Sequence, residues 1–600
     1  MSIDILENTN KIPIVVGVTG HRNIVKDDYS DISAELRKGF EDIIDLCKTE
    51  KPPIILLTGL AQGADMLTAK IAREYDVAYV AVLPCPLQKF RTSFDDEDAL
   101  AELDDYISHA ADVVIVEDIE KDFANQPGQD EDSYRYRQVG IYIAQHSSLL
   151  FALWDGKPPK SKYGCGTTDV VDMALNHSYV KHMTGPHFGM PGDCAVNWIK
   201  CRREGDGSEK DVRSSYLLPS VYHTENDQAA TDTELITLDD EGKYQCLKTA
   251  RLPDITKEII TRTVEYNSYD VDVASINSNY RLLSANEYEQ TSEYQKRLHR
   301  HYLKADALSG GQKKIFIKAV WCLAILGMLI AASFMLYDEL GWNWLSLPCG
   351  AIVIAMIAYY FIVLSPRNQS HRKFLAWRAL TETLRAQFYI SVCGVDYNIC
   401  DSFTWMQKND VVWIDRAIAA LSLGNISNTQ IDLAKVKDKW LGTGTHSKDD
   451  GQYGYHSQKG VENGNRAKKH SSWSTGLMIT TIALYAIIFV MELLTLIGVI
   501  DWLDFGVIWS QFTVRKILQI LFGVLTVVSF LITASLGKLS YDRQKKDNYR
   551  MKRLYFTALN KWDADNKHFE QLVITLAREE IVENGVWLSY MLDNSLEITV

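Results

Sequence analysis

Four long apolar stretches in the second half of the chain constrain its fold more than any other feature. They cover residues 315–337, 346–364, 474–500 and 517–537 of 600, and Lys318 and Glu492 are the only charged residues inside them. A helix of about 20 apolar residues crosses the roughly 30 Å hydrocarbon core of a bilayer. We therefore expect two hairpins of transmembrane helices rather than the buried helices of a soluble protein.

Basic residues gather at one end of each apolar pair. They are Lys313, Lys314, Arg367, Arg372 and Lys373 around the first pair, and Arg466, Lys468, Lys469, Lys538, Arg543, Lys545 and Lys546 around the second. The only basic residues in the connecting loops, 338–345 and 501–516, are Arg515 and Lys516. Because cytoplasmic loops are enriched in Lys and Arg, we expect a multi-pass protein with both termini in the cytoplasm. Tryptophans at 342, 344, 502 and 509 fit an aromatic belt at the outer interface.

Glu492 and Lys318 are the residues that we assign to a pore or to the membrane region. Glu492 lies about five residues, roughly 7.5 Å along a helix, past the middle of its span. Two interpretations fit this position. The side chain faces a water-filled interior, where ionisable groups in spans usually lie, or the helix begins deeper and the side chain reaches the outer interface. The apolar residues 493–500 favour the interior.

Apolar runs that end in small and polar residues recur through the first 225 residues. Residues 12–18 run into Thr19-Gly20-His21-Arg22, and residues 54–57 run into TGLAQGAD at 58–65. A third run, 77–83, ends at Pro84. Such runs are typical of buried parallel strands, and an open α/β sheet binds its ligands at the carboxyl ends of its strands. Backbone N–H groups at helix starts, with an arginine, suit a phosphate.

Two further strands, at 110–116 and 148–154, flank a predicted helix at 134–146 that presents Arg137 near its start. The loop GCGTTD at 164–169 then opens another helix. Its threonines could simply cap that helix without any ligand. Three glycine loops in one domain favour a shared ligand site instead. The residues predicted to line that ligand site are Gly17, Thr19, Gly20, His21, Arg22, Gly59, Ala61, Gly63, Ala64, Asp65, Pro84, Arg91, Arg137, Gly164, Gly166, Thr167, Thr168 and Asp169.

These motifs carry a family resemblance. GVTGHR at 17–22, TGLAQGAD at 58–65, LPCPL at 83–87 with Phe90-Arg91, and GCGTTD at 164–169 together resemble the SLOG family over residues 10–225. That family has a Rossmann-like fold related to the LOG nucleotide phosphoribohydrolases and to DprA. The resemblance implies that the cleft between these loops binds a nucleotide or a nucleotide-derived signal.

One loop departs from the hydrolase branch of that family, which carries PGGxGTxxE. Lys162 and Tyr163 replace its proline and first glycine, and Val170 stands where its glutamate would be. The nearest carboxylate, Asp169, is one residue displaced and one methylene shorter. A misplacement of about 1 Å can reduce a rate 10²-fold, so we expect binding without turnover.

The helical segments that follow each apolar pair also carry a resemblance. Residues Arg378, Glu382 and Arg385 after the first pair, and Arg578, Glu579, Glu583 and Trp587 near the end of the chain, with Trp440, Gln452 and Tyr453, are similar to those of SLATT domains over residues 290–600. The alternative is one split SLATT unit with an added hairpin. SLATT proteins act as pore-forming or membrane-disrupting effectors beside SLOG sensors in bacterial antiphage systems, which implies the inner (plasma) membrane of a bacterium.

Charge and cysteine usage exclude other classes. The net charge is −14, and residues 92–133 hold fifteen Asp or Glu against Lys121 alone, which would repel a nucleic-acid polymer. Ten scattered cysteines without a CxxC pair fit reduced thiols in the cytoplasm, and no signal peptide is evident. His177, His182, His187, Cys194 and Cys201 fit no zinc spacing, so we expect no metal.

The expected fold class is thus a Rossmann-like α/β cytosolic domain followed by an all-α transmembrane region with four spans and cytosolic helices. The expected divisions are 1–225 (nucleotide sensing), 226–310 (linker and juxtamembrane helices), 311–400 (first span pair and its helix), 401–470 (cytosolic connection), 471–545 (second span pair) and 546–600 (cytosolic helices).

We expect a homo-oligomeric membrane effector of antiphage defence that permeabilises the membrane, in abortive infection, when it binds a second messenger. That ligand would be a cyclic nucleotide or an ADP-ribose-derived signal, with no cofactor. Two alternatives stay open: a membrane-tethered nucleotide N-glycosidase or phosphoribohydrolase, and a constitutive channel or transporter. Release of a free base would identify the first alternative. Membrane flux that does not depend on nucleotides would identify the second.

Overall fold

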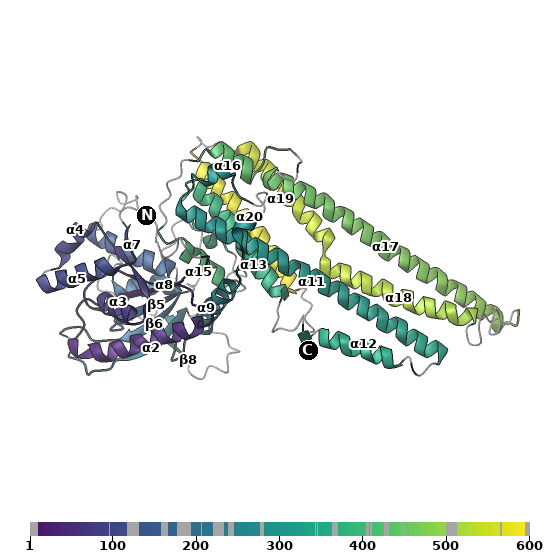
Figure 1. Ribbon diagram of the computed structural model, residues 1–600, viewed down its shortest axis with the longest axis horizontal. Coiled ribbons are helices and arrows are strands. Elements are labelled where there is room, and N and C mark those ends of the chain that lie inside the picture. The colour runs from purple at the N-terminus through teal and green to yellow at the C-terminus, as the bar shows by residue number, and fades with distance from the viewer. Residues whose placement is uncertain are drawn as a thin grey trace. The chain divides into compact units, whose positions relative to one another are not determined.

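The computed structural model describes residues 10–94, 96–116, 131–157, 166–176, 194–205, 207–219, 233–237, 245–276, 281–341, 344, 346–359, 361–362, 370–403, 407, 411–424, 431–445, 447, 450–499, 513–563 and 567–593. The chain divides into two compact units. The first contains Met1–Ile276, Ser284–His301 and Thr383–Ile431, and the second contains Asn277–Leu283, Tyr302–Glu382 and Asp432–Val600. The first unit is α/β and the second is mostly helical (Figure 1).

A mixed β-sheet forms the centre of the first unit. Its described strands are β1 (Ile14–Gly20), β2 (Ile54–Thr58), β3 (Ala78–Leu83), β4 (Asp112–Ile115), β5 (Leu149–Trp154), β6 (Ala195–Lys200), β7 (Arg213–Pro219), β8 (Thr233–Thr237) and β9 (Gln245–Thr249). They lie in the order β4-β3-β2-β1-β5-β6-β7-β9-β8. Neighbours from β4 to β6 are parallel, and the remaining pairs are antiparallel. The α/β class predicted from the apolar runs is confirmed.

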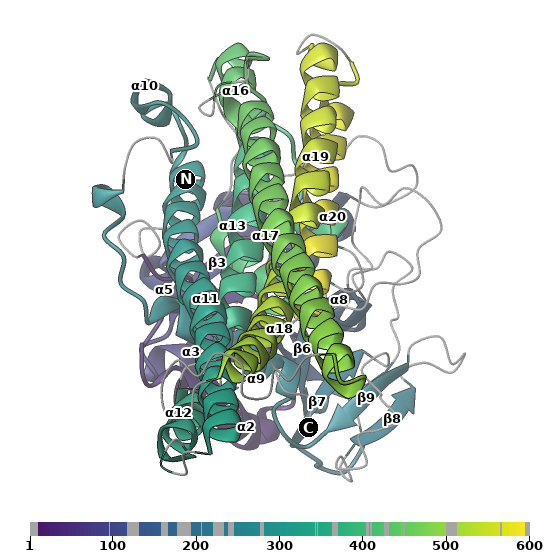
Figure 2. The ribbon, with the colours of Figure 1, turned by 90° about the vertical axis from the view of Figure 1, so that its right-hand side faces the viewer.

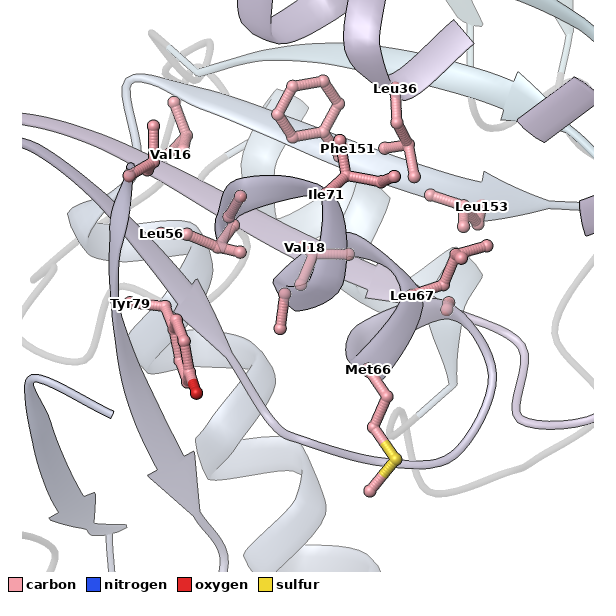
Figure 3. Packing of buried hydrophobic residues seen from close by; sticks show 14 of the residues in the cluster. Val16, Val18, Leu36, Leu56, Met66, Leu67, Ile71, Tyr79, Phe151 and Leu153 are labelled. Carbon is pink, nitrogen blue, oxygen red and sulfur yellow. The ribbon is translucent and has the colours of Figure 1, made fainter. Parts of the chain in front are cut away.

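Helices cover both faces of this sheet. The helices that lie wholly in the first unit are α2 (Tyr29–Cys47), α3 (Ala64–Glu74), α4 (Leu87–Phe90), α5 (Glu97–His109), α7 (Glu131–His146), α8 (Thr167–Asn176), α9 (Asp254–Asn267), α10 (Ala285–Tyr288) and α15 (Val412–Leu421), with the 3-10 helices η1 (Lys26–Asp28), η2 (Arg91–Ser93), η5 (Val273–Ser275) and η9 (Ile399–Ser402). The buried side chains of α2, α3 and the strands interlock on one face (Figure 3). Phe40 of α2, for example, meets Phe151 of β5 with ring centroids 5.0 Å apart.

The opposite face of the sheet carries α7 and α8. Gly17 of β1 points toward α7, because a Cβ there would lie 2.4 Å from Ser147 Oγ and 2.6 Å from Ile143 Cγ2. Gly140 of α7 packs against Val170 of α8 in the same manner. Because both faces are covered, β1 and β5 read in the sequence as continuous apolar runs rather than as alternating ones.

The second unit is built from long helices. The helices that contribute to it are α11 (Glu293–Leu340), α12 (Ser346–Tyr359), α13 (Ser370–Val392), α16 (Leu433–Trp440), α17 (Gly451–Leu496), α18 (Val514–Leu539), α19 (Tyr541–Lys561) and α20 (Phe569–Asp593). α17 and α18 lie side by side in Figures 1 and 2, and Tyr485 meets Phe522 between them. Gly523 of α18 contacts α11, since a Cβ there would lie 2.6 Å from Met335 Sδ.

Three helices are long and apolar enough to cross a membrane: Glu293–Glu339, Gly451–Leu496 and Val514–Ala534. They contain the first apolar stretch of the sequence and most of the third and fourth. The second stretch forms α12, whose 14 residues span about 21 Å, less than the roughly 30 Å of a hydrocarbon core. Part of that stretch lies outside the described residues. The expectation of four membrane-crossing helices is therefore not confirmed, whereas three such helices are present by length and composition.

Candidate functional site

The strand order identifies one place in the sheet where a ligand site is expected. From β1 the chain adds β2, β3 and β4 on one side and then returns to place β5 on the other side. The loops after β1 and β5 consequently leave the sheet in opposite directions. In open α/β sheets such a switch point opens a crevice at the carboxyl ends of the two strands.

The end of β1 supplies the predicted triplet Gly20-His21-Arg22. A Cβ on Gly20 would lie 2.3 Å from that of Ala64, so the glycine lets α3 begin close to β1. His21 Nε2 lies 3.1 Å from Asp155 Oδ1, and the backbone N–H of Asp155 donates to the same nitrogen. Both side chains are at most 10% exposed. This contact bridges the switch point. Arg22 is exposed, and its Cζ lies 5.2 Å from the centroid of the Tyr136 ring.

The loop after β2 is a tight turn closed by Asp65. Leu60 and Gly63 adopt positive φ values of 48° and 82°. A Cβ on Gly63 would lie 2.4 Å from the backbone oxygen of Arg22, which brings this loop against the end of β1. Asp65 Oδ2 accepts a hydrogen bond of 3.3 Å from the backbone N–H of Ala61, and the backbone N–H of Gly59 also interacts with the Asp65 carboxyl group.

The Asp65 carboxyl is 9% exposed, and burial raises its pKa to about 7. The two backbone hydrogen bonds and the nearby Arg22 charge act in the opposite direction. Asp65 therefore already occupies N–H groups of this glycine loop that the sequence had suggested for a phosphate.

The loop before α8 is held in a similar way. Asp169 Oδ2 accepts a hydrogen bond of 2.8 Å from the Gly166 N–H, and Thr168 Oγ1 donates to the Lys157 carbonyl, 3.0 Å away. Burial raises the pKa of Asp169, and the charge of Arg137 opposes that shift. The threonine cap is therefore not confirmed: the Thr168 hydroxyl donates to a loop carbonyl, and the side chain that accepts a backbone N–H at this helix start is that of Asp169. Gly164 lies outside the described residues.

The remaining predicted residues divide into two sets. Thr19, Gly59, Ala61, Ala64, Pro84 and Thr167 lie at the carboxyl ends of the strands or at the helix starts that follow them. Gly17, in contrast, lies within β1 and is packed under α7. Arg91 Nη1 binds Asp104 Oδ1 of α5 at 2.6 Å, on the exposed surface.

Two residues of this site were absent from the sequence prediction. Asp155 bonds to a residue 134 positions earlier, and Tyr136 underlies Arg22 from a separate helix. A usable signal for Asp155 was present, since Trp154-Asp155-Gly156 ends β5 as Gly20-His21 ends β1.

The charged residues of the apolar helices are also placed. Glu492 lies one turn before the end of α17, and its Oε1 accepts a 2.7 Å hydrogen bond from Nε of Arg515, in the first turn of α18. This ion pair joins α17 to α18, and the assignment of Glu492 to a pore or to the outer interface stays a prediction. Lys318 is exposed on α11.

Among the described residues, no group of three or more His, Cys, Asp and Glu side chains could hold a metal ion. His177, His182 and His187 lie outside them. The sequence matches no protein-family model, and no curated protein is significantly similar to it.

Proposed function

We propose that this protein is a nucleotide-gated membrane effector of the SLOG and SLATT type. Its α/β unit would bind a nucleotide second messenger, and its apolar helices would permeabilise the membrane in response. No chemical reaction of the ligand is required, because a ligand shifts a conformational equilibrium by binding one state more tightly than the other.

The observation that carries this proposal is the convergence of polar side chains at the switch point. Arg22 follows β1 and lies over the Tyr136 ring, His21 contacts Asp155 between the ends of β1 and β5, and the turn at Gly63 packs against the backbone of Arg22. These groups belong to three different loops and one helix. Such a mixture of a cation, acceptors and an aromatic face suits a phosphate, a ribose and a base.

The carboxylates in the two loops refine how a phosphate would bind. Asp65 and Asp169 hold the N–H groups of Gly59, Ala61 and Gly166, so a phosphate there would meet a carboxylate rather than free donors. We therefore assign phosphate recognition to the guanidinium groups of Arg22 and Arg137, which can each bind an oxygen pair.

The same geometry weighs against the hydrolase alternative. The carboxylate nearest to the position of the family's catalytic glutamate is that of Asp169, and it is bound to its own loop at Gly166. A general base has to reach its substrate within about 3 Å, directly or through one water. We accordingly propose binding without cleavage.

The membrane part of the proposal comprises four spans per chain, in which the second apolar stretch adds one span to the three described helices, and a homo-oligomeric assembly in a bacterial inner membrane. Its supports are the three described apolar helices and the basic residues that border them.

Dye release from proteoliposomes tests this function. The full-length protein should release dye when cyclic nucleotides or ADP-ribose derivatives are added, and Arg22→Ala should abolish the response while the protein still inserts. Arg37→Ala is the matched control, because the Arg37 side chain of α2 is also accessible to solvent but forms an ion pair with Glu74 of α3. Release without any nucleotide would indicate a constitutive channel, and liberation of a free base would indicate a hydrolase.

A further inference from the structure

Helix α7 runs from the carboxyl ends of the parallel strands to their amino ends. Near its start, Tyr136 lies under Arg22, and the charge of Arg137 acts to lower the pKa of Asp169. Arg22 and Asp169 both follow the carboxyl ends of strands. Its last turn precedes β5, where Ser148 N–H donates to Val15 O at the start of β1. The helix has 16 residues and is about 24 Å long. A displacement of α7 at the candidate site therefore also moves its far end.

The far end of α7 is held by an arginine from much later in the chain. Arg416 of α15 is 3% exposed, and its Nη1 donates to the carbonyls of Gln145, at 3.3 Å, and Ser147, at 3.0 Å. Its Nη2 donates to Asp415 Oδ2 at 3.0 Å. A buried guanidinium at the end of a helix interacts favourably with the negative end of the helix dipole. Its removal leaves buried carbonyl groups without hydrogen bonds, which lowers stability.

The residues after α15 make a second attachment, which extends to α11. Gly424 N–H donates to the Tyr142 hydroxyl of α7 at 3.1 Å. The neighbouring carbonyl of Leu423 accepts a 2.6 Å hydrogen bond from Nη2 of Arg297, a 3% exposed residue in the second turn of α11. α11 continues without interruption to Leu340 and contains the first apolar stretch.

We propose that residues 412–424 are a relay between the nucleotide site and α11. The segment lies between the two apolar pairs in the sequence and binds α7 on one side and the start of α11 on the other. Its attachments are buried and partly charged, so they resist breaking and transmit a shift of α7 as a unit. The regulatory role of this relay rests on the proposed function, whereas its mechanical connection does not.

Hydrogen–deuterium exchange of the full-length protein in lipid nanodiscs, without nucleotide, tests the connection. Arg297→Lys keeps the charge but shortens the donor to Leu423. We expect amides throughout α7, including residues 134–140 near the site, to exchange about tenfold faster. Gln295→Met is the matched control, because Gln295 is equally buried on α11 but donates to Ser391 of α13 instead. It should leave α7 unchanged.

A second variant guards against a general loss of folding. Tyr142→Phe removes only the hydroxyl that Gly424 binds, and it should reproduce the faster exchange of α7 and extend it to residues 293–301 of α11. Faster exchange confined to residues 142–147, or equal effects of Arg297→Lys and Gln295→Met, would overturn the relay. Because no nucleotide is used, a failure of nucleotide binding would contradict the proposed function and leave this result standing.

Discussion

At the scale of single residues, two buried titratable groups in the α/β unit have pKa values shifted in opposite senses. Burial raises the pKa of Asp65 to about 7 and lowers that of His146, near the positive Arg416, to about 4. Each shift makes the stability of the fold depend on pH. The two groups lie near opposite ends of the parallel strands, so each is sensitive to the structure at its own end of those strands.

The ionisation of the buried Asp65 carboxyl should lower the free energy of unfolding as pH rises. The folded state binds a proton more tightly than the unfolded state, so stability is complete below about pH 4 and declines up to about pH 7. The difference of about three pKa units corresponds to about 4 kcal/mol. Asp65→Asn keeps an acceptor for the Ala61 N–H, and its amide does not ionise. Its stability relative to that of the parent protein should therefore increase between pH 4 and 7. Thermal unfolding of both full-length proteins across that range measures it, and parallel curves would contradict it.

His146 should have the reverse effect. Its folded pKa lies below the usual value of 6.5, so the unfolded state binds more protons between about pH 4 and 6.5, and stability is lost as pH falls through that window. The loss is about 3 kcal/mol. His146→Gln should thus gain on the parent protein as pH is lowered. The same unfolding series tests this, and Asp65→Asn provides the comparison, since its gain has the opposite slope.

At the scale of elements, the loop after β2 depends on its glycine. Gly63 has a φ of 82°, and a Cβ would lie 2.4 Å from a backbone carbonyl that has no side-chain freedom to move away. Gly63→Ala should cost roughly 1–3 kcal/mol of stability and displace Arg22. Gly205→Ala is the control, because Gly205 has a similar φ of 81° but open space around it. Equal losses in unfolding midpoint would show that φ alone, and not contact with Arg22, governs the turn.

The α17–α18 hairpin carries a prediction about Glu492. Because Glu492 binds Arg515 at the loop-side end of the hairpin, Glu492→Gln should lower stability by at most about 1 kcal/mol and leave ion selectivity unchanged. Conductance in planar bilayers measures selectivity, with Arg515→Gln as the partner variant. A change of cation selectivity in Glu492→Gln alone would contradict this prediction and would favour Glu492 as a pore-lining residue.

The elements themselves followed from local patterns. The runs at 12–18, 54–57, 77–83 and 148–154 predicted β1, β2, β3 and β5, because parallel strands covered on both faces are apolar throughout. The partners of side chains did not follow. His21 and Asp155, or Arg416 and Gln145, are separated by more than 130 and 270 residues, respectively, and only the folded chain brings them together. The loops were ambiguous because a phosphate and a carboxylate cap require the same N–H groups.

At the scale of the whole molecule, the first unit collects pieces from distant parts of the chain. It includes Ser284–His301 and Thr383–Ile431, which flank the first apolar pair in the sequence. A ligand that shifts this unit therefore acts on a body that contains the start of α11 and the end of α13. The proposed gating would use this arrangement, because the binding of a ligand has to favour one conformation of the spans.

The most direct test of this account compares binding and flux in the same proteoliposomes. Nucleotides would be titrated while thermal stabilisation of the protein and dye release are both recorded. We predict that the two curves have the same midpoint, and that Arg22→Ala moves both to higher concentration by tenfold or more while Arg37→Ala moves neither, since about 1.4 kcal/mol of lost binding corresponds to tenfold. Dye release at full rate without nucleotide, or binding that never alters release, would contradict the account.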